Sequence, residues 1–168
     1  EIIKKIASKK KPVILATGAA SLKDVDRAVS EIRKMNKQLC IMQCNTNYTY
    51  NEENFKYINL NVLKTFKKIF KDKIILGLSD HTQGHSTVLG AVTLGARVIE
   101  KHFTDNNNRK GPDHYFSLNP ITWTEMVKET RRLEKALGNG KKIVEKNEKR
   151  TNYIQRRGSY AIREIRKN

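Results

Sequence analysis

The stretch from residue 74 to residue 118 constrains the fold most, because it combines two strand-like apolar runs with a helical pattern between them. The apolar runs cover 73–78 and 96–99, and the helical pattern covers 87–94 and ends at a glycine. A strand, a helix and a second strand in this order predict a βαβ unit. The two strands of such a unit are expected to be parallel neighbours.

Each of the two apolar runs ends in a polar cluster, Ser79-Asp80-His81 in the first and Glu100-Lys101-His102 in the second. Side chains two positions apart on a strand share a face, so Ser79 is predicted to lie beside His81, and Glu100 beside His102. Asp80 points to the opposite face and is expected to be structural. The two pairs should meet at the carboxyl ends of adjacent strands, where α/β enzymes keep their active sites.

Two imidazoles that converge beside a carboxylate favour a divalent metal site with room for water and substrate. Taken alone, either His81 or His102 is better explained by a hydrogen bond in the core or at a strand end. Taken together, on adjacent strands and each two residues from a hydroxyl or acidic partner, they favour a metal. His85 and His114 are expected to be loop residues, with His114 at the surface.

The strand–helix unit recurs along the chain, which predicts an α/β fold with a parallel sheet. A complete (β/α)8 barrel needs about 250 residues, so the 168 residues present suffice for only part of one. Ser21 is a plausible N-cap with Asp24 three residues later. Strands are expected over 12–17, 38–44, 73–78 and 96–99, and helices over 1–10, 22–35, 61–70, 87–94 and 120–137, with a polar loop over 45–50.

The charge balance is strongly basic, with 34 Lys and Arg against 17 Asp and Glu, or +17. Such a charge suggests nucleic acid, but the lysines are spread along nearly every helix and no nucleic-acid-binding motif accompanies them. Only the segment after residue 141 is dense enough in charge for a polyanion-binding module to remain an alternative. No apolar run approaches the roughly 20 residues of a membrane span, and the start has no signal-peptide pattern.

The two cysteines, Cys40 and Cys44, lie four residues apart in one strand-like run. On an extended strand this spacing separates their Cα atoms by about 13 Å, which is too far for a disulfide. We therefore expect buried thiols in a reducing compartment and a cytoplasmic protein.

Several separated motifs resemble the C-terminal half of the sialic acid synthase family. They are GLSDHT, LGARVIEKHFT and GPDHYFSL, with KPVILATGAASL and LCIMQCNTNYTY upstream and LEKALGNG downstream. The similarity covers roughly residues 11–140. It implies strands five to eight of a TIM barrel, and a reaction that condenses phosphoenolpyruvate with an N-acetylated amino sugar, such as N-acetylmannosamine. The product would be a nine-carbon ulosonic acid, with release of phosphate.

The resemblance also implies a role for individual residues. His81 and His102 match metal ligands, for Mn²⁺ or Mg²⁺, and Glu100 matches a carboxylate beside the metal that handles protons or ligand hydroxyls. If Glu100 had no such role, it would be a strand-end carboxylate paired with a lysine. The candidate catalytic residues are thus Glu100 and Asp113, the substrate-binding residues Ser79, Tyr48, Thr46 and Asp113, and the metal ligands His81 and His102.

Two positions depart from the commoner family pattern on the phosphate side. Ala16 stands where a serine is usual and Thr46 where asparagine or serine is usual. Phosphoenolpyruvate binding is therefore expected to be altered, or shared with Thr17 and Asn45.

The resemblance divides the chain into a partial barrel, 1–140, and a segment, 141–168, that contains the linker and beginning of an antifreeze-like domain. Residues 156–168 have the alternation of that domain's first strand. The family's upstream lysines and glutamates are absent, so the chain is expected to be an inactive fragment of a longer, homodimeric synthase. The alternatives are another metal-dependent barrel enzyme, an aldolase or hydrolase, or a basic module that binds polyanions.

Overall fold

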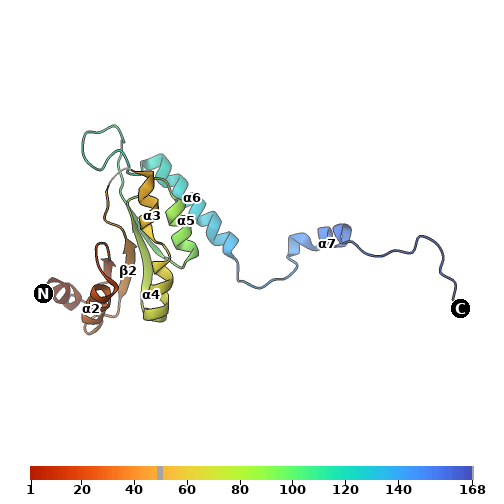
Figure 1. The fold of residues 1–168 in the computed structure, drawn as a ribbon, viewed down its shortest axis with the longest axis horizontal. Coiled ribbons are helices and arrows are strands. Elements are labelled where there is room, and N and C mark those ends of the chain that lie inside the picture. Colours follow the sequence, from red (N-terminus) through yellow and green to blue (C-terminus); the bar gives the residue numbers. More distant parts are fainter. Residues whose placement is uncertain (49–50, 168) are drawn as a thin grey trace. The chain divides into compact units, whose positions relative to one another are not determined.

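The computed structural model of the chain describes residues 1–48 and 51–167, including every side chain in these ranges except that of residue 72. The chain forms two compact units, Glu1–Leu137 and Gly138–Asn168. The first unit contains the sheet, its helices and all the residues of interest for function (Figure 1).

The first unit is built on a four-stranded parallel sheet with the order β1-β2-β3-β4. The strands are β1 (Val13–Ala16), β2 (Leu39–Cys44), β3 (Ile75–Asp80) and β4 (Val98–Lys101). Sequential parallel strands joined by helices make this the half-barrel arrangement that was predicted, an α/β fold of consecutive βα units.

The helices follow the predicted pattern. They are α1 (Ile2–Ser8), α2 (Leu22–Arg33), α3 (Phe55–Ile58), α4 (Val62–Phe70), α5 (Ser86–Thr93) and α6 (Pro120–Leu137), with short 3-10 turns at η1 (Glu52–Asn54) and η2 (Lys71–Lys73). Ser21 caps α2 through a reciprocal capping box with Asp24, as its spacing predicted. The 3-10 turn η1 and the short helix α3 were not predicted, because neither segment shows a complete helical period of apolar residues.

The larger of two hydrophobic clusters among the described residues lies between the sheet and its helices. Strand residues such as Ile41 and Leu78 pack there against helix residues such as Ile32, Leu63 and Phe66. Every second residue of a strand faces this core and the others face away from it, so the strand ends present alternate side chains to two different environments.

The predicted boundaries of β3 and β4 were wrong by about two residues. Prediction placed the ends of these strands before the polar clusters, whereas β3 continues through Asp80 and β4 through Lys101. The reason is the parallel ladder, in which Ser79 pairs with Glu100 and Asp80 with Lys101. Polar side chains are compatible with a strand when its backbone pairs with a neighbouring strand and each side chain has a partner.

Cys40 and Cys44 are both buried and free, as predicted. Burial raises the pKa of the Cys40 thiol to about 11. In the described residues, no helix is both long and apolar enough to cross a membrane.

The second unit contains η3 (Lys146–Glu148) and α7 (Lys149–Gln155). The strand predicted over 156–168 is absent from 156–167, the part of this segment that is described. An alternating sequence forms a stable strand only where a neighbouring strand is available to pair with it, so the prediction was wrong here. That the unit begins an antifreeze-like domain stays a prediction.

Candidate active site

The two candidate metal ligands, His81 and His102, lie next to each other at the carboxyl end of the sheet. His81 directly follows β3 and His102 directly follows β4, and their ring centroids are 5.0 Å apart with an interplanar angle of 66°. The convergence predicted from two equal offsets on neighbouring strands is therefore present. The register of the ladder brings the two rings together.

Hydrogen bonding determines the tautomer of His81. Its Nδ1 lies 2.8 Å from the carbonyl oxygen of Asn45, and because a carbonyl only accepts, Nδ1 must carry the proton. Nε2 then has a free lone pair. A backbone carbonyl that accepts from one ring nitrogen in this way orients a histidine so that the other nitrogen can bind a metal. The contact between the Asn45 carbonyl and His81 was not predicted, because a contact made by a backbone group cannot be recognised in the pattern of side chains.

His102 is held mainly in its neutral form. Burial lowers the pKa of His102, and the nearby His81 lowers it further, while Asp113 and Glu100 act in the opposite direction. The nearest carboxylate oxygen, Asp113 Oδ2, is 3.7 Å from His102 Nδ1. Neutral imidazoles are the form that binds a metal, so the two rings together offer two nitrogen donors.

Glu100 and Ser79 form a pair beside the imidazoles. The Ser79 hydroxyl donates a 2.7 Å hydrogen bond to Glu100 Oε1, which links the carboxyl ends of β3 and β4. Ser79 is buried and Glu100 is exposed. Among the ion pairs found between described residues, none contains Glu100, so its partner here is a hydroxyl and not a lysine.

Aromatic rings flank the two histidines. The Tyr48 ring lies 4.3 Å from the His81 ring and 5.5 Å from the His102 ring, between centroids. On the other side, the Phe116 ring lies 5.2 Å from the ring of His102. Tyr48 is half exposed, so the site has an apolar wall that is open to solvent. Phe116 was not predicted, since a lone aromatic residue in a loop more often signals packing.

The loop after β4 holds Asp113 next to His102. The Asn107 amide nitrogen donates 2.8 Å hydrogen bonds to the carbonyls of His114 and Ser117, and the Thr104 hydroxyl lies 2.8 Å from His114 Nδ1. His114 is thus a half-buried member of the loop's hydrogen-bond network. The prediction of a surface position for it was wrong, because the loop folds back on itself. Gly111 allows this fold, since a Cβ there would come within 2.8 Å of the His114 ring.

Behind the histidines, on the core side, lies a buried ion pair. Lys101 Nζ is 2.7 Å from Asp80 Oδ2, and the two side chains are 2% and 0% exposed. The hydroxyl groups of Thr82 and Thr87 also donate to Asp80, and Lys101 donates to the Thr82 carbonyl. The structural role predicted for Asp80 is confirmed. Lys101 was missed, although the same alternation that separates Asp80 from His81 separates Lys101 from His102.

The phosphate-side residues are arranged differently from the histidines. The Thr17 hydroxyl donates to the Met42 carbonyl at 2.8 Å, so it is already engaged within the sheet. The side-chain amide of Asn45 donates to the Tyr57 carbonyl at 3.2 Å. Thr46 is exposed, and its methyl group occupies the space that a side chain on Gly18 would need. The Thr17 hydroxyl proton and one N–H of the Asn45 amide are therefore engaged by carbonyls of the chain itself.

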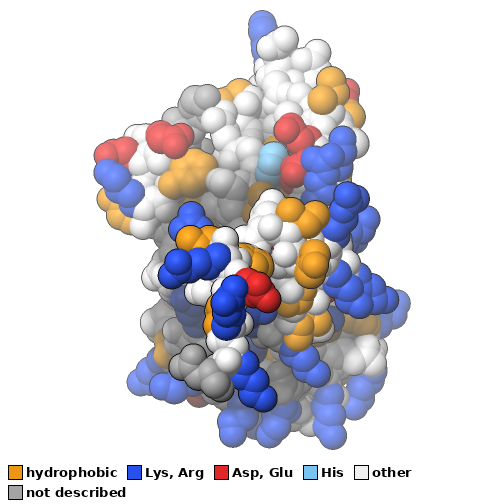
Figure 2. All heavy atoms as spheres, turned by 90° about the vertical axis from the view of Figure 1, so that its right-hand side faces the viewer, with side chains coloured by type: hydrophobic (Ala, Val, Ile, Leu, Met, Phe, Trp, Pro, Cys, Tyr) orange, Lys and Arg blue, Asp and Glu red, His pale blue; other side chains and the backbone are white. Residues whose placement is uncertain are grey.

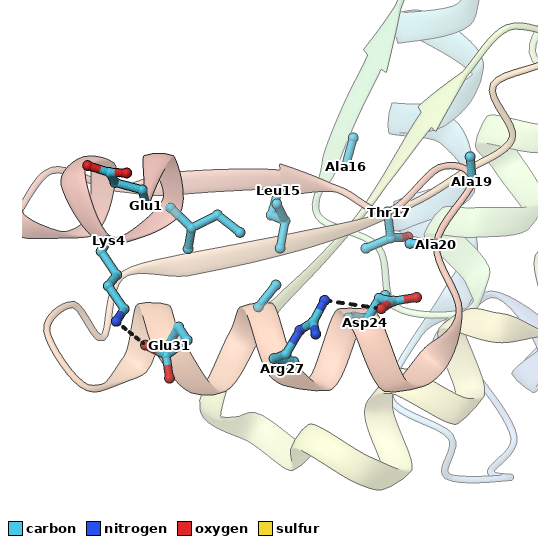
Figure 3. A pocket seen from close by; sticks show the side chains of 13 residues that line it. Glu1, Lys4, Leu15, Ala16, Thr17, Ala19, Ala20, Asp24, Arg27 and Glu31 are labelled. Atoms are coloured by element: carbon cyan, nitrogen blue, oxygen red, sulfur yellow. Dashed lines mark hydrogen bonds and ion pairs between the residues drawn. The ribbon is translucent and has the colours of Figure 1, made fainter.

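A separate cavity of about 420 Å³ runs along the outer edge of β1, between α1 and α2. Four of its five charged lining residues pair with one another, Lys4 with Glu31 at 3.7 Å and Arg27 with Asp24 at 3.4 Å (Figure 3). A smaller cavity of about 150 Å³ adjoins His81, and Phe55, Gln83 and Phe116 help to line it. Of these two cavities, the smaller one is lined by residues of the candidate active site, His81 and Phe116.

The donor set fits two positions of a metal site and no more. In the described part of the chain, no three His, Cys, Asp or Glu side chains are grouped closely enough to hold an ion by themselves. The His81 and His102 rings supply two nitrogen donors. Water and substrate oxygens complete such a site in open catalytic metal centres.

The chain resembles known synthases in sequence and in structure. It is 37% identical to the N,N'-diacetyllegionaminic acid synthase of Campylobacter jejuni over 98% of this chain and 49% of that protein. The crystal structure of the N-acetylneuraminic acid (sialic acid) synthetase of Leptospira borgpetersenii superposes with a TM-score of 0.76 and 31% identity, covering 93% of this chain and 54% of the other.

A more distant structure shows the fold alone. Phospho-2-dehydro-3-deoxyheptonate aldolase (DAHP synthase) of Thermotoga maritima superposes with a TM-score of 0.64 at 20% identity, over 81% of this chain and 42% of that one. The chain spans about half the length of the curated relatives it matches. The NeuB family model matches residues 1–142, and the chain therefore belongs to the NeuB family.

Proposed function

We propose that the chain is the C-terminal half of the catalytic barrel of a synthase that makes a nine-carbon ulosonic acid. The reaction joins phosphoenolpyruvate to an N-acetylated amino sugar and releases phosphate. The observation that carries the proposal is the His81–His102 pair beside Glu100 and Ser79, in a chain of the NeuB family.

His81 and His102 would hold a divalent ion, Mn²⁺ or Mg²⁺, through their free ring nitrogens. The chemistry that such an ion would supply when bound is polarisation of a carbonyl oxygen, here the aldehyde of the open-chain sugar, whose carbon would become electrophilic. The Asn45 carbonyl supports this role, because it keeps the proton of His81 on Nδ1 and leaves Nε2 free.

The remaining residues would bind and orient the substrates. The Glu100 carboxylate, fixed by Ser79, is suited to accept a proton from a sugar or intermediate hydroxyl. Asp113 is suited to accept hydrogen bonds from sugar hydroxyls from its position beside His102. The Tyr48 and Phe116 rings offer apolar surface to the sugar ring or to its acetyl methyl group.

The complete protein would act as a cytoplasmic homodimer with no membrane partner. The choice of amino sugar would depend on groups near the 150 Å³ cavity and on residues of the other barrel half. The candidates are N-acetylmannosamine, a bacillosamine-derived sugar and a phosphorylated sugar.

The decisive experiment measures phosphate release by the complete protein. Release should require phosphoenolpyruvate, an amino sugar and a divalent ion, and should stop with a chelator. His81→Ala and His102→Ala should each lower turnover by about 100-fold or more, because each removes a metal ligand.

His85→Ala is the matched control. His85 stands at the N-cap of α5 without a side-chain capping bond, so turnover should stay within about twofold of the parent. Phosphate release that survives the chelator and both histidine variants would contradict the metal role. A carbonyl substrate cleaved without phosphoenolpyruvate would favour a different barrel enzyme, such as an aldolase.

A further inference from the structure

A third cavity lies at the other end of the sheet from the candidate active site. It has a volume of about 510 Å³, within the range of sites that hold small-molecule ligands. Leu39 and Ile75, the first residues of β2 and β3, line it, whereas the candidate active site is formed after the last residues of the strands. The two sites are therefore at opposite ends of the strands of the same sheet.

The lining of this cavity is basic and contains no described acidic residue. Its five cationic residues are Lys37, Lys67, Lys71, Lys73 and Arg97. They come from three separate segments: the loop before β2, the end of α4 with η2, and the turn before β4. Among the described side chains, no ion pair contains any of the five, although eight other Lys and Arg side chains of the same molecule pair with carboxylates.

The folded arrangement is what brings these charges together. Like charges repel, and the repulsion is strongest where low-dielectric walls focus the field into a concave surface. Lys67, in the last turn of α4, has a local reason for its position, since a cation there balances the helix dipole. Lys37 and Arg97 have no such reason. Lys71 adopts a φ of 53°, a backbone conformation that a glycine would reach with less strain.

The floor of the cavity is apolar. Leu39, Ile74 and Leu76 are buried and Ile75 is 49% exposed, so part of the floor is open to a ligand. Lys and Arg side chains gather along the lower edge of the molecule in Figure 2, toward the end at which Figure 1 shows α4 to finish.

We propose that this cavity, opposite the candidate active site, binds a polyphosphate anion. Several cations without an ion-pair partner among the described side chains, placed around one concave surface, suit a ligand that carries adjacent phosphate groups. The ligand can be a free inorganic polyphosphate or the phosphate chain of a nucleotide, whose base would rest on the apolar floor. The proposal does not depend on the proposed synthase activity.

The test is a titration of the chain with inorganic tripolyphosphate, ATP and inorganic phosphate, without metal, followed by calorimetry. Tripolyphosphate should bind more tightly than inorganic phosphate. Binding should weaken between about 50 mM and about 300 mM salt, because the ligand's charges are then screened. ATP binding more tightly than tripolyphosphate would identify a nucleotide as the source, and equal or weaker ATP binding would identify an inorganic polyphosphate.

Two triple variants separate the cavity from the overall charge. Lys67→Ala/Lys71→Ala/Arg97→Ala removes three cations of the cavity and should weaken tripolyphosphate binding at least tenfold. Lys5→Ala/Lys23→Ala/Lys128→Ala removes three exposed cations elsewhere and should change it less than twofold. All six side chains are exposed, so neither variant removes core packing.

The proposal is overturned if tripolyphosphate does not bind at low salt, or if the two triple variants weaken it equally. Equal weakening would mean that the ligand responds only to the net charge. An RNA oligonucleotide that outcompetes tripolyphosphate and loses affinity equally in both variants would contradict the proposal in the same way. His81→Ala should leave tripolyphosphate binding unchanged, and a loss in that variant would place the anion at the candidate active site instead.

Discussion

At the residue scale, the side chains at the ends of β3 and β4 alternate between two groups. One group lies beside the candidate active site, and the other stabilises the fold. Ser79 and Glu100 hydrogen-bond on one face, next to the two imidazoles, while Asp80 and Lys101 pair on the other. Period-two geometry predicted this division correctly for Ser79, Asp80 and His81. It did not predict the contacts made by backbone atoms, such as the Asn45 carbonyl that holds His81, because every residue has the same backbone groups.

The Cys40 thiol gives a pH prediction at this scale. Burial raises its pKa from 9.0 to about 11, and only the thiolate reacts with an alkylating reagent. Near pH 8 the native thiolate fraction should therefore be about 100-fold lower than in the unfolded chain, and it should rise with pH up to about 11. Mass spectrometry of iodoacetamide labelling, with the urea-unfolded chain as control, measures this ratio. Equal labelling rates in the two states would show that the Cys40 thiol is not buried and that its pKa is not raised.

At the element scale, β3 and β4 are tied together by more than the ladder. Lys101 Nζ donates hydrogen bonds to Asp80 and to the Thr82 carbonyl, both at 2.7 Å. These bonds lie behind His81 and His102. This pair joins the ends of the two strands that carry His81 and His102. We therefore expect it to set the separation of the two rings.

Lys101→Met should destabilise the fold by about 3–5 kcal/mol, because it leaves the Asp80 carboxylate buried without its charge partner. The free energy of unfolding in urea measures the loss. The double variant Asp80→Leu/Lys101→Met should recover much of it, since removing both charges leaves no buried ion unpaired. Lys64→Met, at an exposed position of α4, should stay within about 0.5 kcal/mol of the parent. A loss no larger for Lys101→Met than for Lys64→Met would show that the pair does not contribute to stability.

At the scale of the whole molecule, the sheet has four strands and the chain spans about half the length of its relatives. Under the proposed function, the lysines expected around phosphoenolpyruvate would lie in the other half of the barrel. The 168-residue chain by itself should therefore release no phosphate from phosphoenolpyruvate and N-acetylmannosamine, even with Mn²⁺. The complete protein under the same conditions is the positive control. Turnover by the chain alone would contradict the half-barrel assignment.

The sequence by itself determined the order of strands and helices and the α/β fold, because hydrophobic periodicity is a local property of neighbouring residues. It also determined which side chains share a face at the end of each strand. Only the tertiary structure decided that β3 and β4 run on through Asp80 and Lys101, that His114 is part of a loop network, and that five cations surround one cavity. These depend on contacts between segments distant in sequence, and a local pattern contains no information about the register and loop closure that create them.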